Sequence, residues 1–500
     1  MRYQTTRIPL GAGYNRPYAR LEVTVLSGFA RLNATGFTGE YSRELQMKLR
    51  AAIRNSGFRY PRAAIALHVS TNVRIDRDVG SDLAVALSVL AADGQITPRV
   101  KAAAIGNLGL NGAVLPVENI VGLVQTAVAA GAERALVPTA DAAKLLELAG
   151  LLPIYPVASL REAAEVLQGA GTPLTTASVS EGNVEPDTDP VMLALPGQKI
   201  ALEALEIAAA GWHPVMLLGA PGCGKTSLVE LLSRCLPPLT AAERLALPVP
   251  EGGARGAQGL YGRPFRTPHH HATIASIVGG GRPPEPGECV YADRGILFLD
   301  EYVLFKKEVL ESLRRPLIDG EVRLARNESR RIWRTQFLCV AAANPCPCGY
   351  LYEDGRCRCS AERVNRYQEN LTGPLGDRFD LTVRMPALSA DDLTAIAAKR
   401  GPYVDLKAIR ERIEAAWRRQ EAREPRRDFP RNHYLFDHAR GTADCAETAA
   451  KRAARAAGSL RMSARGLDAL FKVARTIADL RDAERIETED IDRALFFKMS

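Results

Sequence analysis

The chain has 500 residues, which is more than one hydrophobic core usually organises, so two or three domains are expected. With 46% hydrophobic and 24% charged residues it has the profile of a globular protein, which excludes a disordered or fibrous chain. It contains no run of 18 apolar residues and no apolar segment near its N-terminus, which predicts a cytoplasmic protein without a membrane partner. The net charge of +8 mildly favours binding to polyanions, but it does not identify a partner.

Changes in composition divide the sequence into an N-terminal domain, a linker, a core and a helical end. The predicted ranges are 1–168, 169–190, 191–386 and 387–500. The N-terminal domain is expected to be α/β, with a strand at 64–69 and a helix at 81–92. The linker is rich in Gly, Ser, Thr, Pro and acidic residues. Acidic residues at 391–392 and 487–490 are typical of helix starts in the last part.

A glycine-rich segment follows a short apolar stretch at 214–218 and precedes a helical pattern at 227–235. This order of strand, loop and helix is that of a P-loop, whose glycines let backbone N–H groups surround phosphates at a helix N-terminus. Lys225 is expected to reach the β- and γ-phosphates of ATP, and Thr226 to ligate Mg²⁺. The residues expected to bind the nucleotide and its metal are Gly219, Pro221, Gly222, Cys223, Gly224, Lys225, Thr226, Ser227 and Asp300.

Two further apolar strands end in polar residues that suit this chemistry. The strand at 295–299 ends in Asp300, expected to ligate Mg²⁺, and Glu301, expected to polarise the attacking water. The strand at 337–342 ends near Asn344, which is well placed to orient that water. A turn-forming asparagine before a proline is the alternative interpretation of Asn344. Together these residues predict an ATP hydrolase.

Several separate motifs then follow one another along the chain. They are RPFRTPHH at 263–270, GILFLDE at 295–301, LRRPL at 313–317, ANPCPCG at 343–349, GPLGDR at 373–378 and KVARTIADL at 472–480. They resemble the magnesium-chelatase-like AAA+ ATPases of the ComM/YifB type over nearly the whole chain. The resemblance implies an α/β fold with a Lon-protease-like N-terminal domain, a P-loop AAA+ core with a parallel sheet, and a C-terminal helical lid. It also implies a homo-hexamer in which Arg378 is the arginine finger of the neighbouring subunit's site and Arg465 is the lid arginine.

The resemblance to the Lon protease raises the hypothesis of a peptidase. Aligning the Lon nucleophile turn with this chain puts Asp82 at the position of the serine and Val121 at that of the lysine. Without a nucleophile or a base, covalent proteolysis has no chemistry available. The N-terminal domain is therefore interpreted as a scaffold or recognition module.

An arginine-rich β-hairpin is expected at 320–336, and an insertion at 269–287, because similar AAA+ proteins direct both towards the pore of the ring. The hairpin arginines are Arg323, Arg326, Arg330, Arg331 and Arg334. Such a density of charge would neutralise phosphates without reading bases, although a solvated basic turn is the alternative. A second arginine-rich stretch at 418–431 is interpreted as an amphipathic helix.

Two groups of metal-ligand residue types stand out. Cys346, Cys348, Cys357 and Cys359 could bind Zn²⁺ tetrahedrally, and reduced free thiols are the alternative. The consecutive histidines at 269–271 are not expected to bind a metal, because neighbours in sequence point apart.

The leading hypothesis is a ring ATPase that translocates on single-stranded or branched DNA, acting as a helicase or branch-migration motor in recombination or natural transformation. The alternative is a chelatase-like ATPase motor that remodels a protein partner.

Overall fold

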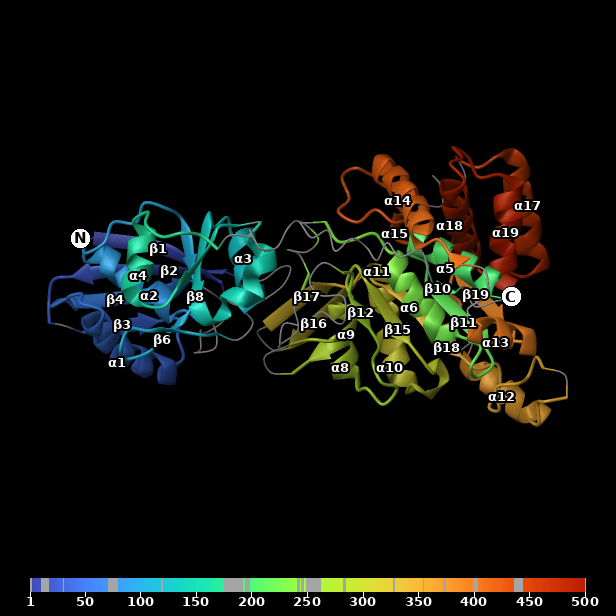
Figure 1. Cartoon of the computed structure of the whole chain (residues 1–500), viewed down its shortest axis with the longest axis horizontal. Coiled ribbons are helices and arrows are strands. Elements are labelled where there is room, and N and C mark those ends of the chain that lie inside the picture. Colours follow the sequence, from blue (N-terminus) through green and yellow to red (C-terminus); the bar gives the residue numbers. More distant parts are fainter. Residues whose placement is uncertain are drawn as a thin grey trace. The chain divides into compact units, whose positions relative to one another are not determined.

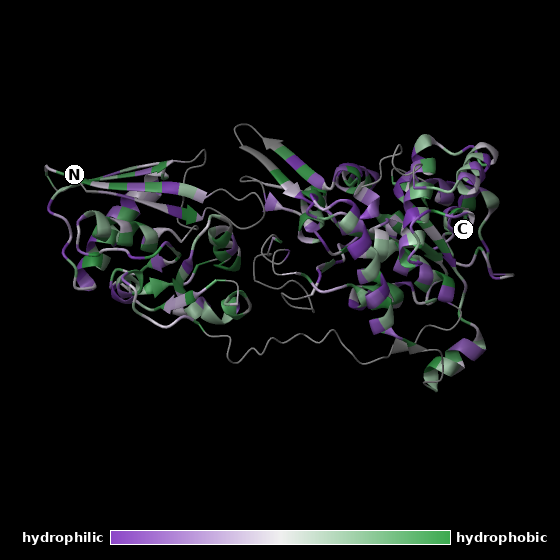
Figure 2. Cartoon of the chain, turned by 90° about the horizontal axis from the view of Figure 1, so that it is seen from above, coloured by the Kyte–Doolittle hydropathy of each residue, from purple (hydrophilic) through white to green (hydrophobic). Residues whose placement is uncertain are grey.

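The computed structural model describes residues 2–9, 18–29, 31–70, 80–117, 120–150, 152–174, 192–193, 198–240, 243, 247–248, 262–281, 285–326, 329–353, 355–371, 375–398, 403–435 and 444–499. The chain forms two compact units, Met1–Asn183 with Leu239–Leu260, and Val184–Pro238 with Tyr261–Ser500. Figure 2 shows helices of both units carrying hydrophobic and hydrophilic residues on the same element, as expected of helices that cover a core on one side. No helix in the described ranges is long and apolar enough to cross a bilayer.

The N-terminal unit combines two larger sheets and one short pair of strands with helices. Its elements are β1 (Arg2–Pro9), β2 (Tyr18–Leu26), β3 (Leu32–Thr35), α1 (Gly39–Asn55), β4 (Ala64–Ser70), α2 (Asp82–Ala92), β5 (Ala102–Ala104), β6 (Asn107–Leu108), β7 (Val114–Leu115), α3 (Ile120–Ala129), β8 (Arg134–Pro138), η2 (Thr139–Leu148), β9 (Ile154–Val157) and α4 (Leu160–Leu167). One of the larger sheets has the order β1-β2-β4-β3 and the other, parallel, the order β5-β8-β9, while β6 pairs with β7. Buried and exposed side chains alternate along the first part of β2, so one face of its sheet packs into a cluster with α1, α2 and α4.

The predicted strand at 64–69 and helix at 81–92 are confirmed as β4 and α2. The predicted linker differs at its start. Leu174 donates its backbone N–H to the carbonyl of Ile154 and packs against the hydrophobic cluster of this unit, so residues up to 174 continue the N-terminal fold. Residues 175–190 lie outside the described ranges. The boundary predicted at 386 stays a prediction.

The second unit is larger. Its strands are β10 (Met192–Leu193), β11 (Val215–Gly219), β12 (Phe265–Arg266), β13 (Gly279–Gly280), β14 (Glu285–Pro286), β15 (Ile296–Leu299), β16 (Glu321–Arg326), β17 (Ser329–Arg334), β18 (Leu338–Ala343), β19 (Leu381–Met385) and β20 (Tyr403–Val404). Its helices are α5 (Lys199–Gly211), α6 (Lys225–Cys235), α8 (Ile274–Val278), α9 (Glu288–Tyr291), η3 (Tyr302–Leu304), α10 (Lys307–Ser312), α11 (Arg314–Asp319), α12 (Ala361–Leu371), η4 (Gly376–Arg378), α13 (Ala390–Ala397), α14 (Leu406–Arg423), α15 (Asn432–Leu435), α17 (Glu447–Ser459), α18 (Ala464–Leu480) and α19 (Thr488–Met499).

A five-stranded parallel sheet with the order β12-β15-β18-β11-β19 forms the centre of this unit. Every residue of β15 and β18 is buried, because helices cover both faces of the sheet. Since the strands are parallel, the carboxyl ends of β11, β18 and β15 meet at one edge. Ligand sites of open parallel sheets lie at this edge.

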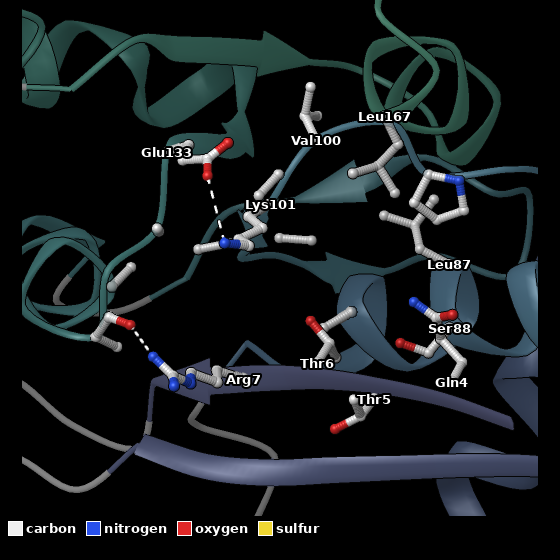
Figure 3. Close-up of a pocket in the computed structure, with 18 of the residues that line it drawn as sticks. Gln4, Thr5, Thr6, Arg7, Leu87, Ser88, Val100, Lys101, Glu133 and Leu167 are labelled. Atoms are coloured by element: carbon white, nitrogen blue, oxygen red, sulfur yellow. Dashed lines mark hydrogen bonds and ion pairs between the residues drawn. The ribbon is translucent and has the colours of Figure 1, made fainter.

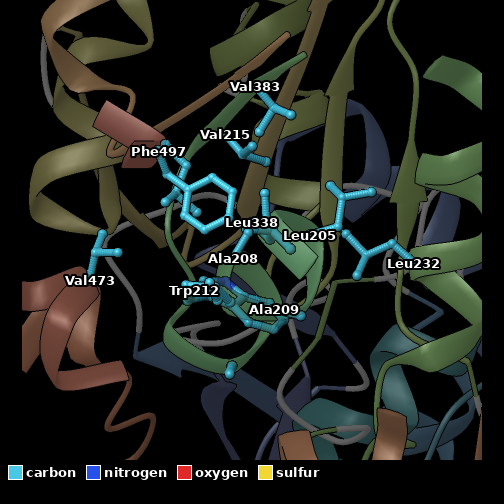
Figure 4. Close-up of a cluster of buried hydrophobic side chains, with 14 of the residues drawn as sticks. Leu205, Ala208, Ala209, Trp212, Val215, Leu232, Leu338, Val383, Val473 and Phe497 are labelled. Carbon is cyan, nitrogen blue, oxygen red and sulfur yellow. The ribbon is translucent and has the colours of Figure 1, made fainter. Parts of the chain in front are cut away.

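The helices after the sheet form the predicted helical end. α14, α17, α18 and α19 group together at the C-terminal end of this unit (Figure 1). They share one hydrophobic cluster with the sheet and α5, drawn in Figure 4. Residues labelled there include Leu205, Ala208, Trp212, Val215, Leu338, Val383, Val473 and Phe497. α13 and α19 begin at the acidic residues from which helix starts were predicted, and Ser389 and Asp392 form a capping box at the first.

Candidate functional site

The loop after β11 has the backbone of a phosphate-binding turn. Gly222 and Gly224 have φ values of 78° and 91°, in the left-handed region that favours glycine. A Cβ on Gly219 would lie 2.6 Å from the Sγ atom of Cys223, so the loop also closes tightly on itself. α6 begins at Lys225, which places the N-terminus of an 11-residue helix directly after the loop. Its free backbone N–H groups and the helix dipole favour an anion there.

Lys225 lies at the centre of this loop. Its Nζ donates to the carbonyl oxygens of Gly219 at 2.7 Å and Ala220 at 3.0 Å. It also donates to Oδ1 of Asn344 at 3.3 Å, which joins the end of β18 to the loop. Burial lowers the pKa of Lys225, while nearby Cys223 and Asp300 oppose this effect. Lys225 and Asn344 are 119 positions apart in the sequence, and they come into contact because β11 and β18 are neighbours in the sheet.

Asp300 and Glu301 follow β15 at the same edge. The Thr226 hydroxyl donates to Oδ2 of Asp300 at 3.4 Å, and the Glu301 backbone N–H donates to Oδ1 of Asp300 at 2.9 Å. The Glu301 side chain is 59% exposed, and its backbone has a φ of 52°. A non-glycine residue in this conformation is strained, and such strain is common at functional sites. Asp300 thus lies beside the hydroxyl predicted to share its metal, while Glu301 faces outwards.

The three consecutive histidines do not behave as expected. Their rings lie against one another, with centroids 4.2 Å apart for His269 and His270 and 4.3 Å apart for His270 and His271. The argument that neighbouring side chains point apart was therefore wrong. Nδ1 of His270 lies 3.3 Å from Oε2 of Glu301. Sequence reasoning missed this contact, because nothing in the spacing relates position 270 to 301.

Arg378 and Arg465 meet, although 87 positions separate them. Nη1 of Arg378 lies 2.9 Å from Oδ2 of Asp377, and Nη1 of Arg465 lies 3.0 Å from the same oxygen. The Arg378 side chain is only 11% exposed, whereas that of Arg465 is 50% exposed. The described hydrogen bonds and ion pairs of both arginines go to Asp377. Asp377 belongs to the GPLGDR motif, but no spacing in the sequence identifies it as the common partner of the two arginines.

The four cysteines predicted to lie together do so. Sγ of Cys346 lies 3.4 Å from that of Cys348 and 3.8 Å from that of Cys357, and the last two are 3.7 Å apart. Cys359 completes a group whose sulfur atoms all lie within 4.8 Å of one another. Backbone N–H groups, that of Tyr350 first, lower the pKa of Cys348 to about 6. Four converging sulfurs with a stabilised thiolate are compatible with a soft metal ion.

The predicted hairpin is confirmed as β16 and β17, which pair antiparallel from Glu321 with Arg334 onwards. Two of its arginines have acidic partners: Nε of Arg323 donates to Glu321 at 2.6 Å, and Arg334 pairs with Asp428. The side chains of Arg326, Arg330 and Arg331 lie outside the described residues. The second arginine-rich stretch, predicted as an amphipathic helix over 418–431, is helical only as far as Arg423, where α14 ends, because Pro425 disfavours helical backbone at the residue before it. Arg423 forms an ion pair with Asp479 at 2.6 Å.

The residues aligned with the Lon dyad are buried in the N-terminal unit. The Asp82 carboxylate accepts hydrogen bonds from the Tyr41 hydroxyl at 2.5 Å and the Leu108 backbone N–H at 3.1 Å. Lys48 lies 3.5 Å away. Val121 is 4% exposed and belongs to the core of α3. Asp82 therefore anchors α2 to its surroundings.

This unit also contains a cavity of about 920 Å³. Figure 3 shows Lys101 directed at Glu133, and their charged atoms lie 3.7 Å apart. Arg7, Arg20 and Arg99 also line the cavity. Among its described lining residues Glu133 is the one carboxylate, and none is a histidine or cysteine. This lining is basic, and its Lys101 ammonium is engaged by Glu133.

Three family models match the chain. "Magnesium chelatase, subunit ChlI" matches residues 192–393, "Magnesium chelatase, subunit ChlI C-terminal" matches residues 405–498, and "Subunit ChlI of Mg-chelatase" matches residues 21–141. The first model covers the loop after β11 and the carboxyl ends of all three site strands. The second covers α18, the helix that carries Arg465.

Similar proteins align over almost their full length. The "Uncharacterized protein YifB" of Salmonella typhimurium is 32% identical, over 99% of this chain and 96% of the relative. The "Competence protein ComM" of Haemophilus influenzae is 30% identical, over 97% and 95%. A protein of Mycobacterium tuberculosis is 31% identical, over 98% and 97%. The chain therefore belongs to the magnesium-chelatase-like AAA+ proteins of the ComM/YifB family, whose P-loop fold implies ATPase activity with ATP and Mg²⁺ as cofactors.

Proposed function

We propose that this protein is a ring-forming ATPase that couples ATP hydrolysis to movement along DNA, as a helicase or branch-migration motor in recombination or natural transformation. One observation carries the ATPase part: hydrogen bonds join Lys225 to Asn344 and Thr226 to Asp300 at one edge of the sheet, beside Glu301. A triphosphate bound there would meet the lysine, metal ligands and base that hydrolysis requires from its own chain.

In this proposal Lys225 exchanges its carbonyl partners for the β- and γ-phosphates, and the N–H groups at the start of α6 donate to the phosphate oxygens. Thr226 and Asp300 would hold Mg²⁺, which would neutralise charge on the phosphates. Glu301 accepts the proton of the attacking water, and Asn344 orients that water. Glu301→Gln keeps the shape of the side chain and removes the base, so ATP binding without turnover is the expected result.

Arg378 is proposed to act in trans, because in its own chain it pairs with Asp377 and not with the P-loop. Mixing two inactive variants tests this. Lys225→Ala and Arg378→Ala subunits mixed in equal amounts should regain activity, since about a quarter of the interfaces in a mixed ring would combine an intact P-loop with an intact arginine. A mixture as inactive as its components would refute action in trans. Analytical ultracentrifugation with a nonhydrolysable ATP analogue checks the hexamer.

The arginine-rich hairpin and the relative named as a competence protein support the DNA part of the proposal. Arg326→Glu with Arg330→Glu should lower affinity for single-stranded or branched DNA by more than tenfold, because each lost phosphate contact weakens binding. Arg426→Glu with Arg427→Glu makes the same change in net charge outside the hairpin and should have little effect. Fluorescence anisotropy at one stated salt concentration measures both. Equal DNA affinity in the two double variants would overturn the assignment of the hairpin.

The family models favour a second candidate function, a chelatase-like motor that remodels a protein partner. The steady-state ATPase rate with no DNA, single-stranded, duplex and branched DNA separates the two. Stimulation by DNA supports the translocation proposal. A rate indifferent to all of them favours the protein remodelling motor.

We also propose that the four cysteines bind one Zn²⁺ ion. Tetrahedral ligation with Zn–S bonds of about 2.3 Å places the sulfurs ~3.8 Å apart, close to the 3.4, 3.7 and 3.8 Å between Cys346, Cys348 and Cys357. Purified protein is expected to release one zinc per chain on treatment with a thiol-blocking mercurial. A Cys357→Ser with Cys359→Ser variant should hold none. Full-length protein without zinc after growth in zinc-supplemented medium would leave the alternative of free thiols.

A further inference from the structure

Two histidines and an aspartate form a buried cluster away from the P-loop. Nδ1 of His213 and Nδ1 of His433 each lie 2.9 Å from the same oxygen, Oδ2 of Asp380. His213 is fully buried and Asp380 is 7% exposed. His213 follows α5, Asp380 precedes β19, and His433 belongs to α15. One carboxylate therefore holds three segments that are far apart in the sequence.

Both histidine rings of this cluster make further hydrogen bonds on their outer sides. Nε2 of His433 lies 3.1 Å from the carbonyl oxygen of Leu317, which can only accept. Its Nδ1 lies against a carboxylate, which also accepts, so both ring nitrogens of His433 lie against acceptors. Burial raises the pKa of Asp380, but the charge of His433 and the hydrogen bonds of both rings outweigh this and bring it below its usual range. Burial lowers the pKa of His213, which favours a neutral ring.

The Nε2 atom of each histidine forms a hydrogen bond with an element that the proposed function uses. Leu317 lies in α11, three residues before Gly320, where the chain enters the arginine hairpin. Nε2 of His213 lies 2.7 Å from the Thr476 hydroxyl in α18, the helix that carries Arg465 near its start.

On the core side, Asp380 follows two residues after Arg378, and its backbone N–H donates to Pro214 at 2.9 Å, directly before the P-loop strand β11. The Lys472 ammonium donates to the carbonyl of His433 at 2.8 Å, and α5, α15, α18 and β19 lie side by side (Figure 1). The cluster thus joins the arginine turn, the hairpin base and the lid. None of its bonds reaches a P-loop residue among the described ones.

We infer that His213, Asp380 and His433 form a positioning node, which holds the Arg378 turn, the base of the hairpin and the lid in the arrangement that ATP turnover requires. The inference rests on the proposed ATPase function and adds residues that touch neither nucleotide nor DNA. A node of this kind acts on the rate of the chemical step, since a misplacement of about 1 Å at a reacting group costs up to ~100-fold. It leaves the binding of ATP by the P-loop unchanged.

The test measures kcat and KM of ATP hydrolysis by the full-length protein in the absence of DNA. His433→Asn can donate to Asp380 or to the Leu317 carbonyl but not to both, so kcat is expected to fall about tenfold while KM stays within about twofold. Thr476→Val removes the hydroxyl that joins His213 to the lid and should lower kcat in the same way. Thr476→Ser restores a hydroxyl and should recover the wild-type rate.

Asp490→Asn is the control for lost stability alone. Asp490 is 1% exposed and pairs with Arg481 at 2.9 Å inside the lid, so its loss destabilises α18 and α19 without touching the node. It should lower the melting temperature and leave kcat unchanged. If kcat tracks melting temperature across all variants, or if His433→Asn and Thr476→Val keep the wild-type kcat, the node is overturned. If His433→Asn does not fold, the pair Thr476→Val and Thr476→Ser decides.

The proposed role of Arg378 as arginine finger is tested independently of the node. Arg378→Ala with wild-type kcat would remove the arginine finger from the proposed function, whatever the node variants do. A wild-type protein without ATPase activity would refute both the proposed function and the node. The ATPase assay of the wild type shows this outcome before any variant is made.

Discussion

Replacing Gly349 by alanine tests whether the cysteine loop positions the P-loop. Gly349 has a φ of +87°, and a Cβ there would lie 2.5 Å from Cδ and 2.9 Å from Cγ of Pro221. Gly355 lies in the same loop with a φ of +72°, but a Cβ on it would have no neighbour within 4 Å. The two substitutions therefore share the backbone strain, and only Gly349→Ala also collides with the phosphate-binding loop.

The magnitudes follow from this difference. A non-glycine residue in the left-handed region costs about 1–2 kcal/mol, which is the whole effect expected on the unfolding free energy for Gly355→Ala. Gly349→Ala adds the overlap with a proline ring, and such overpacking costs about 1–3 kcal/mol. The total is about 2–5 kcal/mol. Because the overlap is relieved by moving Pro221, we also expect ATP affinity to fall at least tenfold, which corresponds to ~1.4 kcal/mol of binding energy.

Urea unfolding followed by circular dichroism measures the first quantity, and titration with a fluorescent ATP analogue measures the second. Gly355→Ala should bind the analogue like the wild type in spite of its lower stability. If Gly349→Ala and Gly355→Ala bind the analogue equally well, the cysteine loop does not set the position of the P-loop, and the reasoning from the Pro221 contact is wrong.

Three further predictions concern other parts of the molecule. Glu301→Gln should lower kcat more than 100-fold while retaining ATP binding, measured by phosphate release and by the fluorescent analogue; a smaller loss would assign the base to another group. Burial lowers the pKa of His213, so below about pH 6.5 the unfolded chain binds a proton that the folded one does not, and stability falls with falling pH. The stability advantage of wild type over His213→Gln should therefore be smaller at pH 5.5 than at pH 7.5 in urea titrations; a constant difference contradicts this. Asp82→Ala leaves the Tyr41 hydroxyl and the Leu108 N–H without their acceptor and should cost ~3 kcal/mol, with an unchanged ATPase rate. Calorimetry and the ATPase assay check it, and a stable variant would contradict the anchoring role of Asp82.

Local sequence was enough to predict the P-loop and the elements around it. A P-loop is one continuous strand, turn and helix, so Lys225 and Thr226 follow from the spacing of the glycines. The hairpin could likewise be predicted, because its two strands are neighbours in the sequence. The ends of β15 and β18 were predicted to contribute Asp300 and Asn344 because each apolar run stops at a polar residue. The parallel sheet brings Asn344 to Lys225 and Asp300 to Thr226.

The sequence by itself determined the motifs, the α/β class and the family, because these depend on residue type and on short spacing. Only the tertiary structure decided the partners of side chains that are far apart in sequence: Asp377 with both arginines, His270 with Glu301, and His213 and His433 with Asp380. The physical reason is that a lone buried histidine carries no periodic signal. Its role is set by which partners the packing of the helices brings within hydrogen-bond distance of the ring.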